Sequence, residues 1–331
     1  MKRFIYFIYY LREINIKKAT AFLYYAHSVT GRPRLLIIID SLKSSFKYNI
    51  SILDYYYFRF FSKTHFERLK WAGTGFMYEF QLRMNPPSSR SVLQNKIEFM
   101  KTLSALIGRE YAKASDLEAS EELASKWLLE KGTKIVVKNS KGQVGSQVAV
   151  VETKNFTTKS LIQFMKKNDF DLIEEFIQQH PALHQLSPSG LNTVRVVTQL
   201  HQGKVIMMAA RLRISINSMV DNLAAGNVAA PIDIKSGIVT GPAIYSDITK
   251  DTVTQHPITK LSIVHFEIPF WQSVLTLVES AALQLSDCRS IGWDVAITIN
   301  GPVLVEGNHN WCKLLWQLPV NKGLKSELEV F

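Results

Sequence analysis

Short β-branched runs follow one another through the second half of this 331-residue chain. The strand patterns occupy 192–200, 205–214, 229–234, 291–299 and 303–308. One long helical pattern, at 270–285, lies between the third and the fourth of them. A doubly wound parallel sheet would instead require strands and helices to alternate regularly. The second half therefore predicts an α+β fold.

The clearest break in composition is the segment Asn-Pro-Pro-Ser-Ser-Arg-Ser at 85–91. Two adjacent prolines and a serine cluster cannot continue a helix, so we expect a boundary there. This boundary separates an N-terminal region, 1–90, from two further units, which we place at 91–177 and 178–331.

The segment after the break mixes helix and strand patterns. We expect helices at 92–106 and 115–129, the second with Ser115 as its N-cap and Glu118 in a capping box, and a third helix at 158–168. We expect strands at 134–138, 147–151 and 170–177.

A glycine- and serine-containing loop, 139–146, joins the first two of these strands. Lys138 ends the strand before the loop, where a strand can deliver a cation to a pocket. Gly142 and Gly145 would let backbone amides approach phosphate oxygens closely. The alternative is that these lysines are merely exposed to solvent. This is common for a lysine beside a glycine hairpin, and also for a lysine on an amphipathic helix, such as Lys96.

Three oxygen-bearing side chains lie on the last two predicted strands. Asp294 lies on one strand, and Glu306 and Asn308 lie two apart on the next, so they share a face. Carboxylate and amide oxygens suit Mg²⁺. We expect a three-residue loop, 300–302, because Pro302 cannot donate a ladder hydrogen bond; this register pairs Asp294 with Asn308.

Arginines also occur on the predicted strands. Arg211 and Arg213 share a face by alternation, and Arg195 comes from a neighbouring strand. Guanidinium groups bind carboxylates and phosphates through two parallel hydrogen bonds, although surface salt bridges are the alternative. Asp221 and Asn222, with Gly226, are expected to shape a loop beside bound phosphates.

Taken in order, these segments resemble the ATP-grasp superfamily of ligases. The closer resemblance is to the sugar-transfer associated ATP-grasp family, also described as related to alpha-L-glutamate ligases. It is carried by motifs between about 185 and 310: Leu191-Asn-Thr-Val-Arg195, Val220-Asp-Asn222, Gly292-Trp-Asp-Val-Ala-Ile297 and Gly301-Pro-Val-Leu-Val-Glu-Gly-Asn308.

The resemblance implies a site for ATP and Mg²⁺ between two α+β lobes, 91–177 and 178–331. It implies that Asp294, Glu306 and Asn308 bind the metal and that Arg195, Arg213 and Asn222 act in catalysis. The residues it implies for the nucleotide are Lys96, Lys138, Gly142, Gly145 and the segment Glu174, Glu175 and Ile177, of which the main chain of Glu175 and Ile177 would contact adenine.

The implied activity is that of a ligase, which activates a carboxylate as an acyl phosphate and joins it to an amine or another nucleophile. The family name points to surface polysaccharide or glycoconjugate synthesis, with a glycan or small molecule as substrate. The alternatives are a kinase of the same fold that phosphorylates a sugar hydroxyl, and a non-catalytic membrane- or glycan-binding module.

Most of the excess positive charge lies near the N-terminus. The whole chain carries a formal net charge of +11, of which residues 1–70 contribute +9, and the same residues hold 17 of the 36 aromatic side chains. Basic and aromatic residues suit an anionic membrane surface. They also suit an aromatic helical core with a solvated basic face, or a nucleic acid, which we do not expect.

Two cysteines, Cys288 and Cys312, exclude a disulfide scaffold and a cysteine-rich zinc module. No stretch approaches the roughly 20 apolar residues that span a bilayer. We therefore expect a cytoplasmic protein, with attachment to the inner face of the membrane through residues 1–70 as a further hypothesis. The oligomeric state is not predicted.

Overall fold

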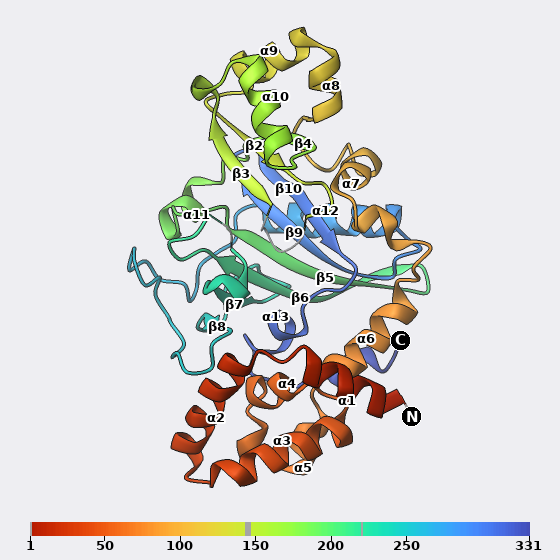
Figure 1. Ribbon diagram of the computed structural model, residues 1–331, viewed down its shortest axis with the longest axis vertical. Coiled ribbons are helices and arrows are strands. Elements are labelled where there is room, and N and C mark those ends of the chain that lie inside the picture. The colour runs from red at the N-terminus through yellow and green to blue at the C-terminus, as the bar shows by residue number, and fades with distance from the viewer. Residues whose placement is uncertain (1, 143–146, 220) are drawn as a thin grey trace.

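A computed structural model of the chain describes residues 2–142, 147–219 and 221–331. Helices gather at one end of the molecule, a small sheet with three helices lies at the other end, and a large sheet lies between them (Figure 1). Every paired strand runs antiparallel to its neighbours. The predicted α+β fold is therefore confirmed.

The N-terminal end is built from short helices: α1 (Lys2–Arg12), α2 (Ile16–Thr30), α3 (Arg34–Tyr48), α4 (Ile52–Tyr57), the 3₁₀ helix η1 (Phe60–Ser62), α5 (His65–Leu69) and α6 (Thr74–Met84). Its core is aromatic, and it includes Tyr55, Phe58 and Phe60. This core packs against Ile248 and helix α13 (Lys313–Gln317) of the large lobe. A buried ion pair between Lys313 and Asp54, with N–O distance 3.1 Å, reinforces the contact.

The small lobe contains a four-stranded sheet of order β1-β4-β2-β3. Its elements are η2 (Arg90–Leu93), α7 (Lys96–Thr102), β1 (Tyr111–Lys113), α8 (Ala114–Ala119), α9 (Glu121–Leu129), β2 (Lys134–Lys138), β3 (Val148–Glu152), η3 (Thr153–Asn155), α10 (Thr158–Lys167) and β4 (Leu172–Glu175). Trp127, Leu161 and Ile173 belong to the core between this sheet and its helices.

Four local predictions for the small lobe are corrected. The helix expected at 115–129 is two helices, because Ser120 has extended backbone and its side chain accepts the N–H of Leu123, which starts α9. The capping box expected at Ser115 is absent from α8; instead, the backbone N–H of Lys113, which precedes the helix, donates to Asp116 Oδ2 at 3.3 Å. The helix expected at 92–106 shortens to α7, and the strand expected at 170–177 shortens to β4.

The large lobe contains a six-stranded sheet of order β10-β9-β5-β6-β7-β8. Its elements are α11 (Pro181–Leu186), β5 (Thr193–His201), β6 (Lys204–Ile214), η4 (Leu223–Ala225), β7 (Val228–Ile232), β8 (Ile244–Tyr245), α12 (Trp271–Gln284), β9 (Ser290–Thr298), β10 (Gly301–Asn308), α13 and α14 (Lys325–Leu328). Helix α12 contacts β5, β6, β9 and β10, and their apolar side chains form the largest core.

The predicted register of the last hairpin is wrong. Thr298 pairs with Gly301, so the turn has two residues, and Pro302 pairs with Ile297. A proline is tolerated there because β10 is an edge strand. A bulge between Leu304 and Glu306 then shifts the register by one residue and sets Glu306 directly opposite Asp294.

Candidate functional site

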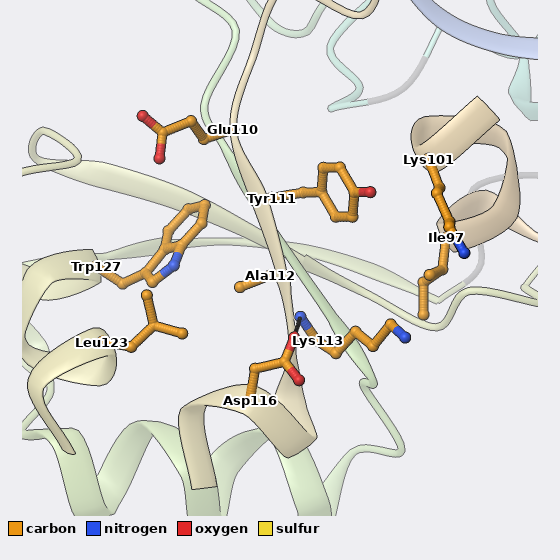
Figure 2. Close-up of a pocket in the computed structure, with 9 residues that line it drawn as sticks. All are labelled: Ile97, Lys101, Glu110, Tyr111, Ala112, Lys113, Asp116, Leu123 and Trp127. Atoms are coloured by element: carbon orange, nitrogen blue, oxygen red, sulfur yellow. Dashed lines mark hydrogen bonds between the residues drawn. The ribbon is translucent and has the colours of Figure 1, made fainter. Parts of the chain in front are cut away.

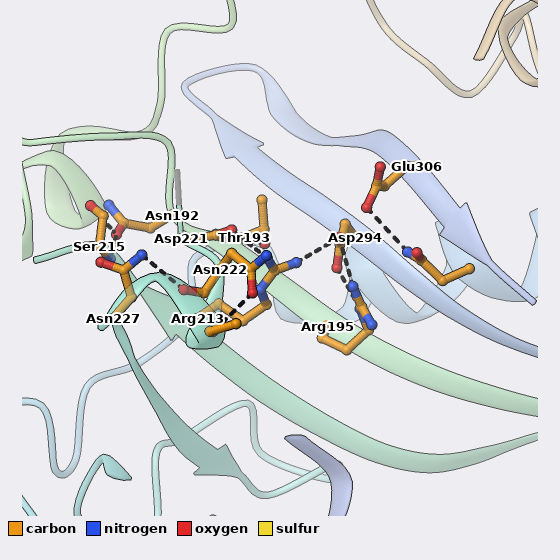
Figure 3. A network of polar contacts seen from close by, with 12 residues as sticks. Asn192, Thr193, Arg195, Arg213, Ser215, Asp221, Asn222, Asn227, Asp294 and Glu306 are labelled. Carbon is orange, nitrogen blue, oxygen red and sulfur yellow. Dashed lines mark hydrogen bonds and ion pairs between the residues drawn. The ribbon is translucent and has the colours of Figure 1, made fainter. Parts of the chain in front are cut away.

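The acidic hairpin brings a buried carboxyl group, Asp294, and a half-buried one, Glu306, side by side. Asp294 is only 2% exposed and lies opposite Glu306, while Asn308 donates its amide N–H to Glu306 Oε1 at 3.2 Å. Figure 3 shows Glu306 and Asp294 approaching each other from neighbouring strands. The bulge thus places all three predicted metal ligands on one face, by a route that differs from the predicted loop.

Two arginines hold the carboxylate of Asp294. Arg195 donates to both of its oxygens, from Nε at 2.5 Å and from Nη2 at 2.8 Å, and Arg213 donates from Nη1 at 2.6 Å. Burial alone would raise the pKa of Asp294, but these guanidinium groups lower it below its usual value. Burial and the adjacent Asp294 carboxylate raise the pKa of Glu306.

This donor set fits a divalent cation. Two carboxyl groups and one amide are oxygen ligands of the kind that Mg²⁺ prefers, and a cation between them would relieve the repulsion that raises the pKa of Glu306. Within the described ranges, no cluster of three or more His, Cys, Asp and Glu side chains is arranged for a metal ion. The third ligand here would be the Asn308 amide oxygen.

Arg213 extends the network to the loop that precedes η4. It forms an ion pair with Asp221 at 2.7 Å, and Asp221 also accepts hydrogen bonds from the backbone N–H and hydroxyl of Thr193 (Figure 3). Burial raises the pKa of Asp221 despite Arg213. Asn222 is the N-cap of η4 and accepts the N–H of Ala224 at 3.0 Å.

Arg211 has a different environment from Arg213, although the two are two residues apart on β6. Arg211 pairs opposite Arg195 in the sheet, but its guanidinium donates to the carbonyl of Trp316 at 2.6 Å. The arginines expected to bind a substrate carboxylate or phosphate are therefore bound to this chain's own groups. Two of them, Arg195 and Arg213, converge on the acidic hairpin.

Lys138, at the end of β2, contacts a carboxylate in the neighbouring strand. Its Nζ lies 2.8 Å from Glu174 Oε2, and Arg109 Nε donates to the same oxygen at 2.8 Å. Burial alone would raise the pKa of Glu174, but Lys138 and Arg109 lower this pKa to about 2. Glu174 therefore stays ionised at neutral pH and fixes both cations at this edge of the small lobe.

Lys96, the first residue of α7, points to the start of the glycine loop. Its Nζ donates to the carbonyl of Gly142 and, at 3.4 Å, to that of Asn139. Burial lowers its pKa, and the carboxylate that opposes this effect most is Glu306. Lys96 therefore lies within electrostatic reach of the acidic hairpin. Gly145 lies outside the described residues.

The predicted adenine-binding segment starts in β4 with Glu174, the carboxylate that holds Lys138, and continues through Glu175. The N–H of Glu175 donates to the carbonyl of Glu110 at 3.1 Å, and its carboxylate accepts the N–H of Glu110 at 2.7 Å. The Glu175 amide is thus occupied by the segment that leads into β1. Ile177 lies two residues past the end of β4, and its role stays a prediction.

Arg109 joins the two clusters, and sequence reasoning missed it. Besides Glu174, its guanidinium donates to the carbonyl of Leu304 at 2.5 Å and to that of Val305 at 3.4 Å, which are the bulge residues of β10. Neither motif nor spacing marks this residue. Its neighbours are brought together only by the packing of the two lobes.

A cavity of about 450 Å³ lies apart from these residues, beside β1 (Figure 2). It contains none of the predicted site residues and is lined by Ile97, Lys101, Glu110, Tyr111, Ala112, Lys113, Asp116, Leu123 and Trp127. Trp127 and Leu123 approach it from α9, whereas Lys101 and Ile97 approach from α7 (Figure 2). Size alone therefore does not select the candidate site.

Two antiparallel α+β lobes, with lysines on the smaller and an acidic hairpin on the larger, define an ATP-grasp protein. Residues 76–331 match the family described as sugar-transfer associated ATP-grasp. The chain belongs to this family. A search of the curated proteins finds no match.

Solved structures with a similar arrangement include several ligases. The L-amino acid ligase of Bacillus licheniformis matches with 15% identity and a TM-score of 0.40, over 67% of this chain and 41% of that one. The D-alanyl-alanine synthetase A of Vibrio cholerae matches with 15% identity and a TM-score of 0.42, over 74% and 65%. This chain thus spans less than two thirds of either protein.

Proposed function

We propose that the protein is an ATP-dependent ligase that activates a carboxylate and joins it to an amine or another nucleophile. The observation that carries the proposal is the convergence of Asp294, Glu306 and Asn308 on one face, with Lys96 within electrostatic reach. An anionic group that would hold a metal thus lies near a cation of the other lobe. This is the charge distribution that a nucleoside triphosphate with a bound divalent metal ion requires.

The proposed reaction has two chemical steps. An oxygen of the substrate carboxylate attacks the γ-phosphorus of ATP, and ADP leaves. The amine then attacks the acyl carbon, phosphate departs with that carboxylate oxygen, and the nitrogen loses a proton. Bound Mg²⁺ would neutralise phosphate charge, and Asp294, Glu306 and Asn308 would hold it.

The basic residues would serve two steps. Lys96 and Lys138 would exchange their present partners, the Gly142 carbonyl and Glu174, for phosphate oxygens. Arg195 and Arg213 would stabilise negative charge on the transferred phosphoryl group or orient the carboxylate, since both already lie against Asp294. Asn222 would shape the loop beside Arg213.

The family name supports a role in surface polysaccharide or glycoconjugate synthesis, for example the joining of an amino acid to a carboxylated sugar. We place this reaction in the cytoplasm, because ATP is available there. No helix in the described ranges has the length and apolar character needed to cross a membrane.

The test is a screen of carboxylates and amines with MgATP, in which ADP and inorganic phosphate are both measured. We expect equal amounts of ADP and phosphate when the correct pair is present. The variant Glu306→Gln should be inactive, whereas Glu329→Gln, which alters an exposed carboxylate, should retain activity. ADP with a phosphorylated product and no free phosphate would identify a kinase instead.

A further inference from the structure

Helix α3 buries Ile37 in the N-terminal core but turns several other large apolar side chains to solvent. The inward stripe contains Ser41 and Ser44, which are 2% and 1% exposed. The outward stripe contains Leu35, Ile39 and Phe46, of which Leu35 is 67% exposed, whereas Leu42 is half-buried against the core. A helix that only closed the core would bury all of these apolar side chains.

Helix α1 continues this apolar surface. The rings of Phe7 and Phe46 are 4.2 Å apart between centroids, and Arg3 donates to the carbonyl of Phe46 at 3.2 Å. These contacts fix α1 against α3, while Tyr10 anchors α1 in the protein at 6% exposure. The side of α1 that faces away from the protein exposes Phe4, Ile5, Ile8, Tyr9 and Leu11.

The same end of the molecule is strongly basic. Among the described residues up to 70, the exposed Lys and Arg side chains are Lys2, Arg3, Arg12, Lys17, Arg34, Lys43, Lys47 and Lys70. Two of the four carboxylates in this region are already paired, Asp40 with Arg68 and Asp54 with Lys313. Glu13 and Glu67 are the exposed ones, so positive charge prevails around the apolar stripe.

We propose that the outer face of α1 and α3 binds the surface of an anionic lipid bilayer. Leu35, Ile39 and Phe46 would enter the headgroup and acyl boundary, and Lys43 and Lys47 on the same helix would contact lipid phosphates. A 15-residue helix lying in this plane covers about 22 Å. In Figure 1 this end lies opposite α8, α9 and α10, so attachment leaves the small lobe turned away from the membrane.

Charge complementarity selects this partner. A second copy of the chain, docked through the same face, would bring two basic surfaces together. A nucleic acid would match the charge, but it is bound through aromatic stacking platforms and not through an aliphatic Leu and Ile stripe. An anionic bilayer matches both the charge and the apolar side chains.

The test is cosedimentation of the full chain with phosphatidylcholine vesicles that either contain or lack phosphatidylserine. We expect binding to the anionic vesicles and release at high salt. Lys43→Gln with Lys47→Gln should weaken binding about 25-fold, since each lysine near the surface contributes roughly fivefold. Leu35→Gln with Ile39→Gln should also weaken it.

Matched controls lie elsewhere on the molecule. Leu129→Gln removes an apolar side chain that is 79% exposed on α9, and Lys204→Gln removes an exposed charge at the start of β6; neither should affect vesicle binding. All variants change exposed residues, and thermal unfolding will show that they remain folded. Equal binding to both vesicle types, or no binding to either, would overturn the proposal. The proposal would also be overturned if the wild-type chain formed a dimer in the absence of lipid and the double variant Leu35→Gln with Ile39→Gln were monomeric.

Discussion

Replacement of Arg109 by methionine should destabilise the protein strongly, although no sequence motif marks this residue. The Arg109 and Glu174 side chains are only 3% and 2% exposed, and their charged atoms are 2.8 Å apart. The loss of one partner of a buried ion pair costs about 3–5 kcal/mol. Lys138 would still neutralise Glu174, so we expect the lower end, about 3 kcal/mol.

The assay is urea unfolding at pH 7 with the wild type, Arg109→Met and a control, Lys154→Met. Lys154 pairs with Glu152 at 2.9 Å, but its side chain is 78% exposed, so the control should cost less than about 1 kcal/mol. An equal cost for both variants would refute the assignment of Arg109 as the connection between the lobes. If Arg109→Met costs the expected free energy of unfolding but leaves ATP turnover unchanged, the role of Arg109 is limited to stability.

The same ion pair predicts how stability depends on pH. The pKa of Glu174 is lowered to about 2 in the folded protein, so its contribution is complete above the pKa of an unfolded glutamate, about 4.3. It is lost as the pH falls toward 2. The difference in unfolding free energy between wild type and Arg109→Met should therefore be constant from pH 7 to 5 and shrink below about 4.3.

Three further predictions concern single residues. Glu306→Gln should abolish ATP turnover and leave the circular dichroism spectrum unchanged; normal turnover would remove Glu306 from the metal site. Lys138→Ala should weaken ATP binding by about 1.5–3 kcal/mol in calorimetry, because a charge-assisted phosphate contact is lost; an unchanged affinity would contradict this. Lys313→Met should leave Asp54 buried without its cation and destabilise the protein by about 3 kcal/mol, and a change below 1 kcal/mol would show that the hydrogen bonds to Ser51 and Thr74 suffice for Asp54.

The sequence predicted those elements whose pattern is local. The runs at 134–138 and 291–299 alternate or are β-branched over enough residues to be recognised, and they form β2 and β9 with nearly the predicted bounds. Strand β1 was missed because its three residues, Tyr111–Lys113, carry no periodicity of their own. Their pairing with β4 depends on the packing of the lobe.

The candidate site illustrates the same limit. Residue types and the family resemblance predicted Asp294, Glu306 and Asn308 as metal ligands, but the register that aligns them depends on a bulge whose carbonyls are held by Arg109 from the other lobe. The attraction between Arg213 on β6 and Asp294 on β9 likewise depends on the order of strands in the sheet. Such contacts join residues far apart in the chain, and no local pattern encodes them.

The central claim is that a nucleotide and a divalent metal bind between the two lobes, at Lys96, Lys138 and the acidic hairpin. The most direct measurement is calorimetric titration with a non-hydrolysable ATP analogue, with and without Mg²⁺, for the wild type, Glu306→Gln and the control Glu329→Gln. We predict Mg²⁺-dependent binding to the wild type and the control, and strongly weakened binding to Glu306→Gln. Binding that is independent of Mg²⁺ and equal in all three proteins would contradict the account.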